Sequence, residues 1–383
     1  MPASMLILVY SSIQLNIMSL LKLRGELNAQ QRIILAILGG IITLLIWWAL
    51  AEALAQQRPV VSGELKELPS TFDTSISQQQ RDSILRQDSI LQSQATSFVK
   101  VYPILPPPLK VIRSYQGLLA QDELVGNTSR SIWLNIQGYI WALIIALPLG
   151  FVLGLIPLFR GLFSRQIDAL RYLPLSALTS LFIVWFGLED TMKVAFLAFG
   201  ILVYLLPVIV QRIQEVEDVY VQTAFTLSAT NWQTIRSVYI PAVFSKVMED
   251  IRVLTAISWT YIIIAELLNR QGGIGGLIFI KSKMGQIDKV FAILLLIILI
   301  GFIQDRIFSY IDKRVCPHKY LKYKLPGLQE CQYGIYFILL MLLAKTVLPT
   351  LIPSMAIWAA LLVGLVMICL GELRIMGASK AGK

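Results

Sequence analysis

Histidine, cysteine and charged side chains are scarce in this chain. Its 383 residues include one histidine, three cysteines and 15% charged residues, against 56% hydrophobic residues. About a quarter of the residues in a typical soluble domain are charged, and a soluble fold of this size cannot bury so much apolar surface. The composition therefore excludes an ordinary water-soluble protein and indicates an integral membrane protein.

The scarcity of histidine and cysteine also limits the chemistry that the chain can perform. His318 is the only imidazole available for acid–base catalysis, and it lies in a lysine-rich stretch without a neighbouring carboxylate. Cys316, Cys331 and Cys369 show no Cys-x-x-Cys spacing, so they predict neither a disulfide framework nor a zinc site. Cys316, His318 and Cys331 together would supply three ligands, whereas a structural zinc site uses four. We expect no catalytic residue, no metal and no cofactor.

A phosphate-binding loop, Gly-x-x-x-x-Gly-Lys-Ser/Thr, is also absent from the sequence. The chain is therefore not expected to hydrolyse a nucleotide by that route. The glycine-rich stretch Gly272-Gly-Ile-Gly-Gly276 is too short and wrongly placed for a dinucleotide-binding fingerprint. We expect a flexible turn there that needs no ligand.

Long apolar runs are present instead. A helix needs about 20 predominantly apolar residues to cross the hydrocarbon core, and a lipid-exposed backbone must satisfy its own hydrogen bonds. Met5 to Leu23 is a weaker run that contains Gln14 and Asn16, which favours an amphipathic helix at the interface over a ninth span. The eight predicted spans lie near 33–55, 130–157, 167–187, 192–213, 244–268, 290–311, 333–349 and 352–372.

The net charge of +10 is expected to orient these spans rather than to bind nucleic acid. Loops with an excess of lysine and arginine face the cytoplasm. Lys22, Arg24 and Arg32 place the N-terminus there, and eight spans then place the polar segment 214–243 on the same side. The loop 269–289 is an exception, since it is assigned outside although basic residues outnumber acidic ones in it.

Residues 56–128 form a long hydrophilic stretch between the first two predicted spans. Its Gln/Ser-rich part, Ser75 to Ser97, is amphipathic and is a candidate helix. The run from Tyr102 to Pro108 is expected to be extended, because proline lacks an amide donor and restricts its neighbour. We interpret the stretch as a solvated extracytoplasmic spacer, with contact to an extracytoplasmic partner as the alternative.

The polar segment 214–243 separates two apolar runs and is expected to carry function. Acidic residues near its start favour the N-terminal end of a first short helix. Thr230 or Asn231 can cap a second one, and Pro241 can begin the next span, where its missing amide costs nothing. The sequence therefore predicts two short helices with a break that starts near Ser228.

This segment resembles the cytoplasmic loop of permease subunits of ATP-driven importers, which reads Glu-Ala-Ala, three residues, Gly, nine residues, Ile-x-Leu-Pro. The corresponding residues here are Gln222-Thr-Ala224, then Ser228, then Val238-Tyr-Ile-Pro241. Glutamine replaces the acid, threonine the first alanine and serine the glycine. Because serine adopts a positive φ only with strain, we expect the turn to be displaced towards Asn231.

The resemblance extends from Pro106 to about Pro317 and is to the permeases of nitrate, sulfonate, taurine and bicarbonate importers. The elements that carry it are Arg171-Tyr-Leu-Pro174, Ile183-Val-Trp-Phe-Gly187, Ser258-Trp259, Ala265-Glu266 and Gly272-Gly-Ile-Gly-Gly276. The resemblance implies an all-α membrane protein, with a type I ABC importer permease core of about six transmembrane helices and an extra C-terminal helical hairpin. It implies a multi-pass bacterial inner membrane protein that imports a small oxyanion or organosulfur compound. It also implies as partners cytoplasmic ABC ATPase subunits, an extracytoplasmic solute-binding protein and a second permease, with a homodimer favoured over a heterodimer.

The resemblance also indicates the functional residues. The candidates for coupling to the ATPase are Gln222, Ala224, Ser228, Asn231, Arg236 and Pro241. Ala224 and Ser228 are four residues apart, so we expect them to be stacked on one helix face that another protein approaches closely. The candidates for the translocation path or gate are Arg171, Pro174, Ser258, Trp259, Tyr261 and Glu266. A charge at the bilayer centre costs about 2.5–3.5 kcal/mol, so Glu266 is expected in a structural pair or near the outer gate rather than as a ligand.

Two rival functions remain open at this point. An ion-coupled secondary transporter would be expected to show inverted repeats and broken helices, which the sequence does not display. The other rival is a membrane enzyme or a membrane scaffold. The enzyme is disfavoured because paired intramembrane Asp, Glu or His residues are absent. The expected organisation is an N-terminal segment and first span (1–55), an extracytoplasmic segment (56–128), the permease core (129–315), a basic cytoplasmic linker (316–332) and a hairpin with a tail (333–383).

Overall fold

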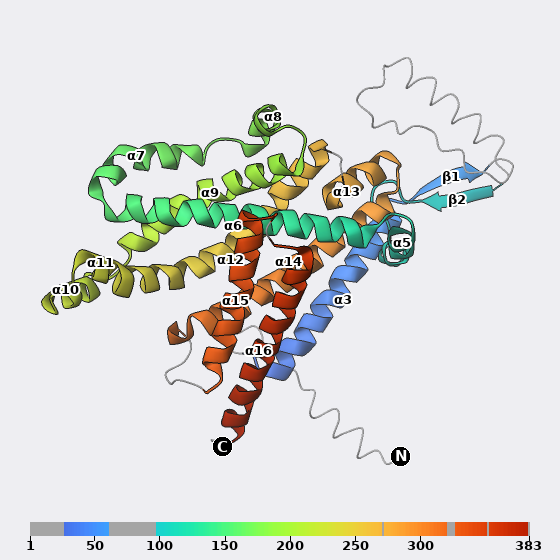
Figure 1. Ribbon diagram of the computed structural model, residues 1–383. Helices are drawn as coiled ribbons and strands as arrows, with labels where there is room; N and C mark the ends of the chain where they lie inside the picture. The colour runs from blue at the N-terminus through green and yellow to red at the C-terminus, as the bar shows by residue number, and fades with distance from the viewer. Residues whose placement is uncertain (1–26, 61–96, 270–271, 320–325, 351, 382–383) are drawn as a thin grey trace, which may run out of the picture. The chain divides into compact units, whose positions relative to one another are not determined.

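The computed structural model describes residues 27–60, 97–269, 272–319, 326–350 and 352–381 (Figure 1). The chain divides into two compact units, residues 1–115 and 116–383. The predicted interfacial helix at Met5 to Leu23 and the Gln/Ser-rich segment at Ser75 to Ser97 lie outside the described residues, except for Ser97 itself.

The described part of the first unit contains one long helix and a two-stranded antiparallel sheet. The helix α3 (Ala29–Ala53) confirms the span predicted at 33–55. The strands β1 (Gln56–Val60) and β2 (Ser97–Val101) pair with Gln56 opposite Val101. Glu52, near the end of α3, forms an ion pair with Lys100 of β2 and accepts a hydrogen bond of 3.2 Å from Tyr102. The helix end and the sheet are thereby joined.

Helix α5 (Pro108–Ala120) follows the proline run and was not predicted. Residues 102–107 form neither helix nor strand, as expected for that run. Proline is well tolerated at the first position of a helix, where Pro108 lies. Val111, Ser114 and Leu118 are buried and follow the i, i+3, i+7 spacing of a helix with one buried face. The spacer interpretation of 56–128 therefore overlooked a helix.

Three long helices form the centre of the second unit. They are α6 (Leu124–Leu155), α9 (Asp190–Gln214) and α12 (Ile240–Asn269), and they correspond to the spans predicted at 130–157, 192–213 and 244–268. Glycines of α6 face large side chains of α9 so closely that an added Cβ would lie 2.5–2.6 Å from them. These contacts pair Gly138 with Leu197, Gly150 with Ile209 and Gly154 with Ile213. Small residues allow spans to approach this closely in a bilayer, where hydrophobic burial does not drive association.

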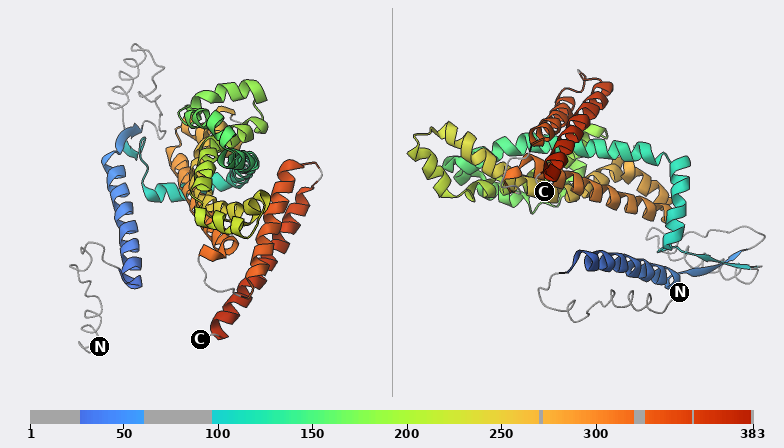
Figure 2. Two further views of the ribbon diagram at one scale, coloured as in Figure 1. Left: turned by 90° about the vertical axis from the view of Figure 1, so that its left-hand side faces the viewer. Right: turned by 90° about the horizontal axis from the view of Figure 1, so that it is seen from below.

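The span predicted at 167–187 is wrong as a single helix. The chain instead forms α7 (Pro157–Leu170) and α8 (Leu175–Phe186), bent by 103° at a short break. Pro174, the N-cap residue of α8, has an extended backbone, as N-cap residues usually do. Helix α8 is seen nearly end-on in Figure 1, whereas α6 and α9 lie in the plane of the picture, so α8 crosses them (Figures 1 and 2).

The second unit is completed by a short helix, a long helix and a hairpin. Helix α13 (Gly273–Lys283) leads to α14 (Ile287–Val315), a short 3-10 turn η2 (Pro317–Lys319), and the pair α15 (Leu328–Val347) and α16 (Ser354–Ala381). Arg314 of α14 donates two hydrogen bonds of 2.7 and 2.8 Å to Glu372 of α16, which ties the hairpin to α14. Within the described residues, seven helices are long and apolar enough to cross a membrane, or eight if α7 and α8 form one broken span.

Candidate functional site

The segment 214–243 folds as two short helices beyond one end of α9 and α12 (Figures 1 and 2). They are α10 (Asp218–Thr226) and α11 (Asn231–Thr234), and the π-helical turn η1 (Ile235–Tyr239) joins α11 to α12. The predicted break is confirmed, since residues 227–230 belong to neither helix. We call residues 214–243 the coupling segment.

Ser228 occupies the left-handed position that ends α10. Its φ is +58°, its amide donates to Phe225 (2.9 Å), and the amide of Ala229 donates to Ala224 (3.0 Å). Two such bonds form a Schellman motif, in which the left-handed residue is usually glycine. The expected displacement of the turn towards Asn231 is therefore wrong, because the two hydrogen bonds offset the strain of a serine at this position.

Thr230 caps the second helix. Its hydroxyl accepts a hydrogen bond of 3.3 Å from the amide of Gln233, and the Gln233 side chain accepts one of 2.8 Å from the amide of Thr230. This reciprocal pair is a capping box. Asn231 is thus the first helical residue and not the cap, and the turn spans only Leu227 to Thr230.

The expected stacking of Ala224 and Ser228 on one helix is wrong. Helix α10 ends at Thr226, so Ser228 lies beyond it, and Ala224 is half-buried whereas Ser228 is exposed. The other coupling candidates, Gln222, Asn231, Arg236 and Pro241, are exposed. Large apolar side chains of the coupling segment are also exposed, and these were not predicted: Val219, Tyr220, Phe225, Leu227 and Trp232.

An ion-pair cluster fixes the base of the coupling segment. Arg212 near the end of α9 donates to both carboxylate oxygens of Asp250 on α12, at 2.7 and 2.8 Å, and to Glu215 at 2.8 Å. Lys246 donates to the backbone oxygen of Glu215 at 3.1 Å. The hydrogen bond from Arg212 holds the pKa of the Glu215 carboxyl below its usual value. The cluster therefore joins the start of the coupling segment to both α9 and α12.

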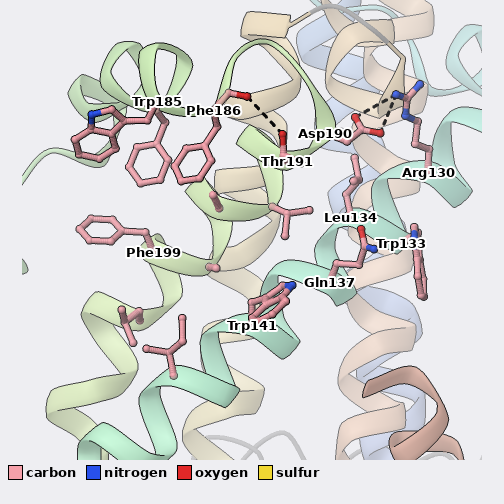
Figure 3. A pocket seen from close by; sticks show the side chains of 16 residues that line it. Arg130, Trp133, Leu134, Gln137, Trp141, Trp185, Phe186, Asp190, Thr191 and Phe199 are labelled. Carbon is pink, nitrogen blue, oxygen red and sulfur yellow. Dashed lines mark hydrogen bonds and ion pairs between the residues drawn. The ribbon is translucent and has the colours of Figure 1, made fainter. Parts of the chain in front are cut away.

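A groove of about 860 Å³ lies between α6, α8 and α9 (Figure 3). Its walls are mostly aromatic and aliphatic, and Trp133, Trp141 and Trp185 are among the residues that form them. The residues that line it are Arg130, Trp133, Leu134, Gln137, Trp141, Ile145, Phe182, Trp185, Phe186, Asp190, Thr191, Val194, Ala195, Ala198, Phe199 and Leu202. A concave apolar surface with a few polar groups is the usual form of a small-molecule site.

The charged groups of this groove lie at one end. Arg130 of α6 donates hydrogen bonds of 2.9 and 3.1 Å to the two carboxylate oxygens of Asp190 at the start of α9. Asp190 also pairs with Lys193 at 3.0 Å, and the Lys193 side chain is fully buried. Gln137 adds an uncharged polar group to the groove, next to the aromatic walls (Figure 3).

None of the path residues predicted from the sequence lines this groove. Ser258, Trp259 and Tyr261 are buried on α12. The Ser258 hydroxyl lies 2.7 Å from the backbone oxygen of Thr255 and 3.1 Å from Oδ1 of Asn135, and its one proton bonds to one of them. The Trp259 indole donates to Gln304 at 2.8 Å, and Tyr261 packs edge-on against Phe196. Arg171 and Pro174 are exposed at the break between α7 and α8.

Glu266 is fully buried and holds the start of α13. One carboxylate oxygen accepts the Gly275 amide (2.8 Å) and the other accepts the Ser131 hydroxyl (2.6 Å). Ser131 accepts the Ile274 amide (2.9 Å), and Asn127 accepts the Gly273 amide (2.8 Å). Three successive amides of a helix N-terminus, where a negative charge is favoured, are thereby satisfied.

The expected flexible turn at Gly272 to Gly276 is therefore wrong. Residues Gly273 to Gly276 form the buried first turn of α13. The other end of α13 is also held, because Lys281 and Lys289 donate to Asp122 at 2.5 and 2.6 Å. Burial alone would raise the pKa of Asp122, but the hydrogen bonds from the two lysines outweigh it and the pKa lies below its usual value.

Comparison with known proteins places this architecture in a family. The binding-protein-dependent transport system inner membrane component matches residues 130–316. An ABC transporter permease protein of Methanocaldococcus jannaschii is 30% identical over 208 residues, which cover 53% of this chain and 77% of the relative. The chain belongs to this permease family.

Other relatives of the permease carry names that include a substrate. An aliphatic sulfonates transport permease protein of Bacillus subtilis is 26% identical over 215 residues, which cover 55% of this chain and 77% of the relative. A taurine transport system permease protein of Escherichia coli is 24% identical over 221 residues, which cover 56% of this chain and 79% of the relative. Helices α15 and α16 lie beyond the residues that match the family.

Family membership confirms the predicted fold class and the predicted function. The permease is an all-α, multi-pass inner membrane protein and a transport subunit of an ABC importer. Membership of this family does not support the rival interpretations of the chain as a secondary transporter, a membrane enzyme or a scaffold. The residues that line the groove were not predicted. The sequence did contain a signal for part of the lining, since residues at a spacing of four along one face of α6 contribute to it: Trp133, Gln137, Trp141 and Ile145.

Proposed function

We propose that the permease moves a small solute by alternating access, driven by a separate ATPase that docks on the coupling segment. The exposed apolar side chains of that segment carry this proposal. Val219, Leu227 and Trp232 are 66%, 78% and 67% exposed, and they lie on α10, on the turn that follows it and on α11. A cluster of apolar side chains that are exposed to water is typical of a protein-binding surface.

The partner is proposed to hydrolyse ATP, because this chain has no phosphate-binding loop. Arg212 links the coupling segment to α9 and α12, so closure of two ATPases would shift both helices as rigid bodies. A second copy of the permease would close the open groove beside α6, α8 and α9. Ser258, Trp259, Tyr261 and Glu266 would support this path from behind, and Arg171 and Pro174 would act at the break beside it.

The proposed substrate is a small oxyanion or organosulfur compound, delivered by an extracytoplasmic solute-binding protein. The names of the sulfonate and taurine permeases support this class. The chemistry of the groove agrees with it, since an aliphatic sulfonate has an apolar chain for the aromatic walls and an anionic head for the end that holds Arg130. The 56–128 segment would lie on the outer side and the basic linker 316–332 on the cytoplasmic side.

Co-purification tests this assignment. The full chain, isolated in mild detergent from its own cells, is expected to retain an ATPase subunit. Vesicles that contain the complex should take up labelled taurine or another short sulfonate only when ATP and the solute-binding protein are both present. Uptake that depends on a proton or sodium gradient without ATP would contradict the proposal.

Cysteine labelling tests the orientation of the coupling segment. In a chain whose native cysteines are replaced by alanine, Asn231→Cys is expected to react with a membrane-impermeant maleimide only after the cells are opened. Ser129→Cys is the control, because Ser129 is also exposed but lies near the start of α6, at the opposite end of the spans. Labelling of position 231 in intact cells would reverse the topology.

A further inference from the structure

A second, polar pocket lies where the end of α9 meets α7. Its volume is about 340 Å³, and Leu153, Ile167, Pro207 and Val210 form its apolar floor. The polar residues that line it are Arg160, Ser164, Asp168, Arg171, Gln211 and Gln214. Gln214 is the first residue of the coupling segment, so the pocket lies at that end of the spans.

The arginines of this pocket differ from five others in the described part of the second unit, though not from Arg165, Arg236 and Arg306, which also form no ion pair there. Arg130, Arg212, Arg252, Arg314 and Arg374 each form an ion pair with a carboxylate. Arg160 and Arg171 form no ion pair with any residue that the structure describes, although Asp168 lines the same pocket. Two guanidinium groups and one carboxylate leave the pocket with a net positive charge. Arg160 is half-buried and Arg171 is exposed, so an anion that enters the pocket can reach both guanidinium groups.

Helix α7 also presents apolar side chains that the protein leaves uncovered. Leu158, Leu162 and Phe163 are 66%, 53% and 47% exposed, and no residue of α7 is fully buried. The same short helix thus carries guanidinium groups on its pocket side and bare aliphatic and aromatic groups elsewhere. A soluble anion would satisfy only the arginines, whereas a phospholipid has a phosphate for the arginines and acyl chains for the apolar side chains.

We propose that the pocket between α7 and α9 binds the phosphate of one acidic phospholipid through Arg160 and Arg171, with its acyl chains against α7. Arginine binds phosphate oxygens through paired N–H groups. Basic pockets between spans on the cytoplasmic side suit acidic headgroups. The assignment to the cytoplasmic leaflet rests on the proposed function, whereas lipid binding itself does not. The bound lipid would link α7 to the end of α9 beside the coupling segment.

Native mass spectrometry of the full-length permease tests this proposal. The protein is purified in a mild detergent and supplied with phosphatidylglycerol or phosphatidylcholine. We expect one phosphatidylglycerol per chain to remain bound and phosphatidylcholine to be released. Arg160→Gln combined with Arg171→Gln should lower phosphatidylglycerol retention about tenfold or more, because hydrogen bonds to a charged group are lost.

Matched variants separate site binding from general charge and folding effects. Arg165→Gln makes the same change on an exposed side chain of α7 that does not line the pocket, so it should retain the lipid. Arg160→Lys with Arg171→Lys keeps the charge but loses the paired N–H groups, so it should restore part of the retention, and that partial recovery would exclude misfolding as the cause of the loss in the glutamine variant. Equal retention by the glutamine variant would overturn the proposal. So would displacement of the lipid by millimolar inorganic phosphate, which would mark a soluble-anion site, or a glutamine variant that loses only its dimer, which would mark an interface between copies.

Discussion

Tryptophan in place of Ser228 is expected to release the ATPase from the permease and to abolish substrate uptake. Ser228 is exposed at the left-handed end of α10, next to Leu227 and near the capped start of α11. A close-packed interface accommodates added bulk poorly, at a cost of about 1–3 kcal/mol. At about 1.4 kcal/mol per tenfold change, this cost weakens ATPase binding by roughly 5-fold to 150-fold. ATPase retention on the purified permease, measured with uptake into vesicles, is the readout.

Two variants control this experiment. Ser237→Trp makes the same change at another exposed serine of the coupling segment, whose hydroxyl donates to the backbone oxygen of Gln233 one turn earlier. It should retain the ATPase if docking centres on the turn. Gln233 itself is unsuitable, because it belongs to the capping box with Thr230. Ser228→Gly should also retain the ATPase, since glycine adopts a φ of +58° without strain. Wild-type uptake and retention in Ser228→Trp would refute the docking surface.

Alanine in place of Gly273 is expected to destabilise the permease strongly. Gly273 has a φ of +87°, and an added Cβ would lie 2.3 Å from Oε1 of the buried Glu266 carboxylate. A left-handed backbone costs a non-glycine residue about 1–2 kcal/mol, and overpacking adds about 1–3 kcal/mol. The substitution would also break the carboxylate contacts that hold α13. A lower unfolding temperature and a smaller yield of monodisperse protein in detergent are the expected results.

Gly285→Ala separates backbone strain from the steric contact. Gly285 has a φ of +70°, similar to that of Gly273, but no atom lies within 4 Å of its added Cβ. The Gly285→Ala variant should therefore lose only about 1–2 kcal/mol of stability, which is the cost of the left-handed backbone. An unfolding temperature for Gly273→Ala equal to that of Gly285→Ala would show that the contact with Glu266 contributes nothing to stability.

The long spans could be predicted because each one depends on a single continuous stretch of the sequence. Helices α3, α6, α9, α12 and α14 each contain a continuous apolar run long enough to cross a bilayer, and such a run needs no information from elsewhere in the chain. The sheet of β1 and β2 could not be predicted, since its strands are only five residues long and lie 36 residues apart in sequence. Their pairing depends on contacts that local periodicity does not contain.

The turn of the coupling segment shows where local reasoning fails. Propensity placed the left-handed residue near Asn231, because asparagine tolerates that conformation better than serine does. The structure places it at Ser228, where two backbone hydrogen bonds close α10 and the Thr230–Gln233 capping box begins α11. The end of α10 and the start of α11 together determine the position of the turn. The preference of a single residue for the left-handed conformation does not predict this outcome.

The sequence by itself determined that this chain is a membrane permease and where its coupling segment lies, because hydropathy and motif spacing are properties of neighbouring residues. Only the tertiary structure decided which side chains meet across helices. It bent α7 from α8 by 103°, buried Glu266 against the first turn of α13, and gathered Trp141 and Trp185 into one groove. Contacts of this kind join residues up to 167 positions apart in sequence, such as Asp122 and Lys289. Packing between whole helices determines such pairs. The backbone hydrogen bonds of each helix are formed within that helix, so its orientation depends on the side chains of neighbouring helices.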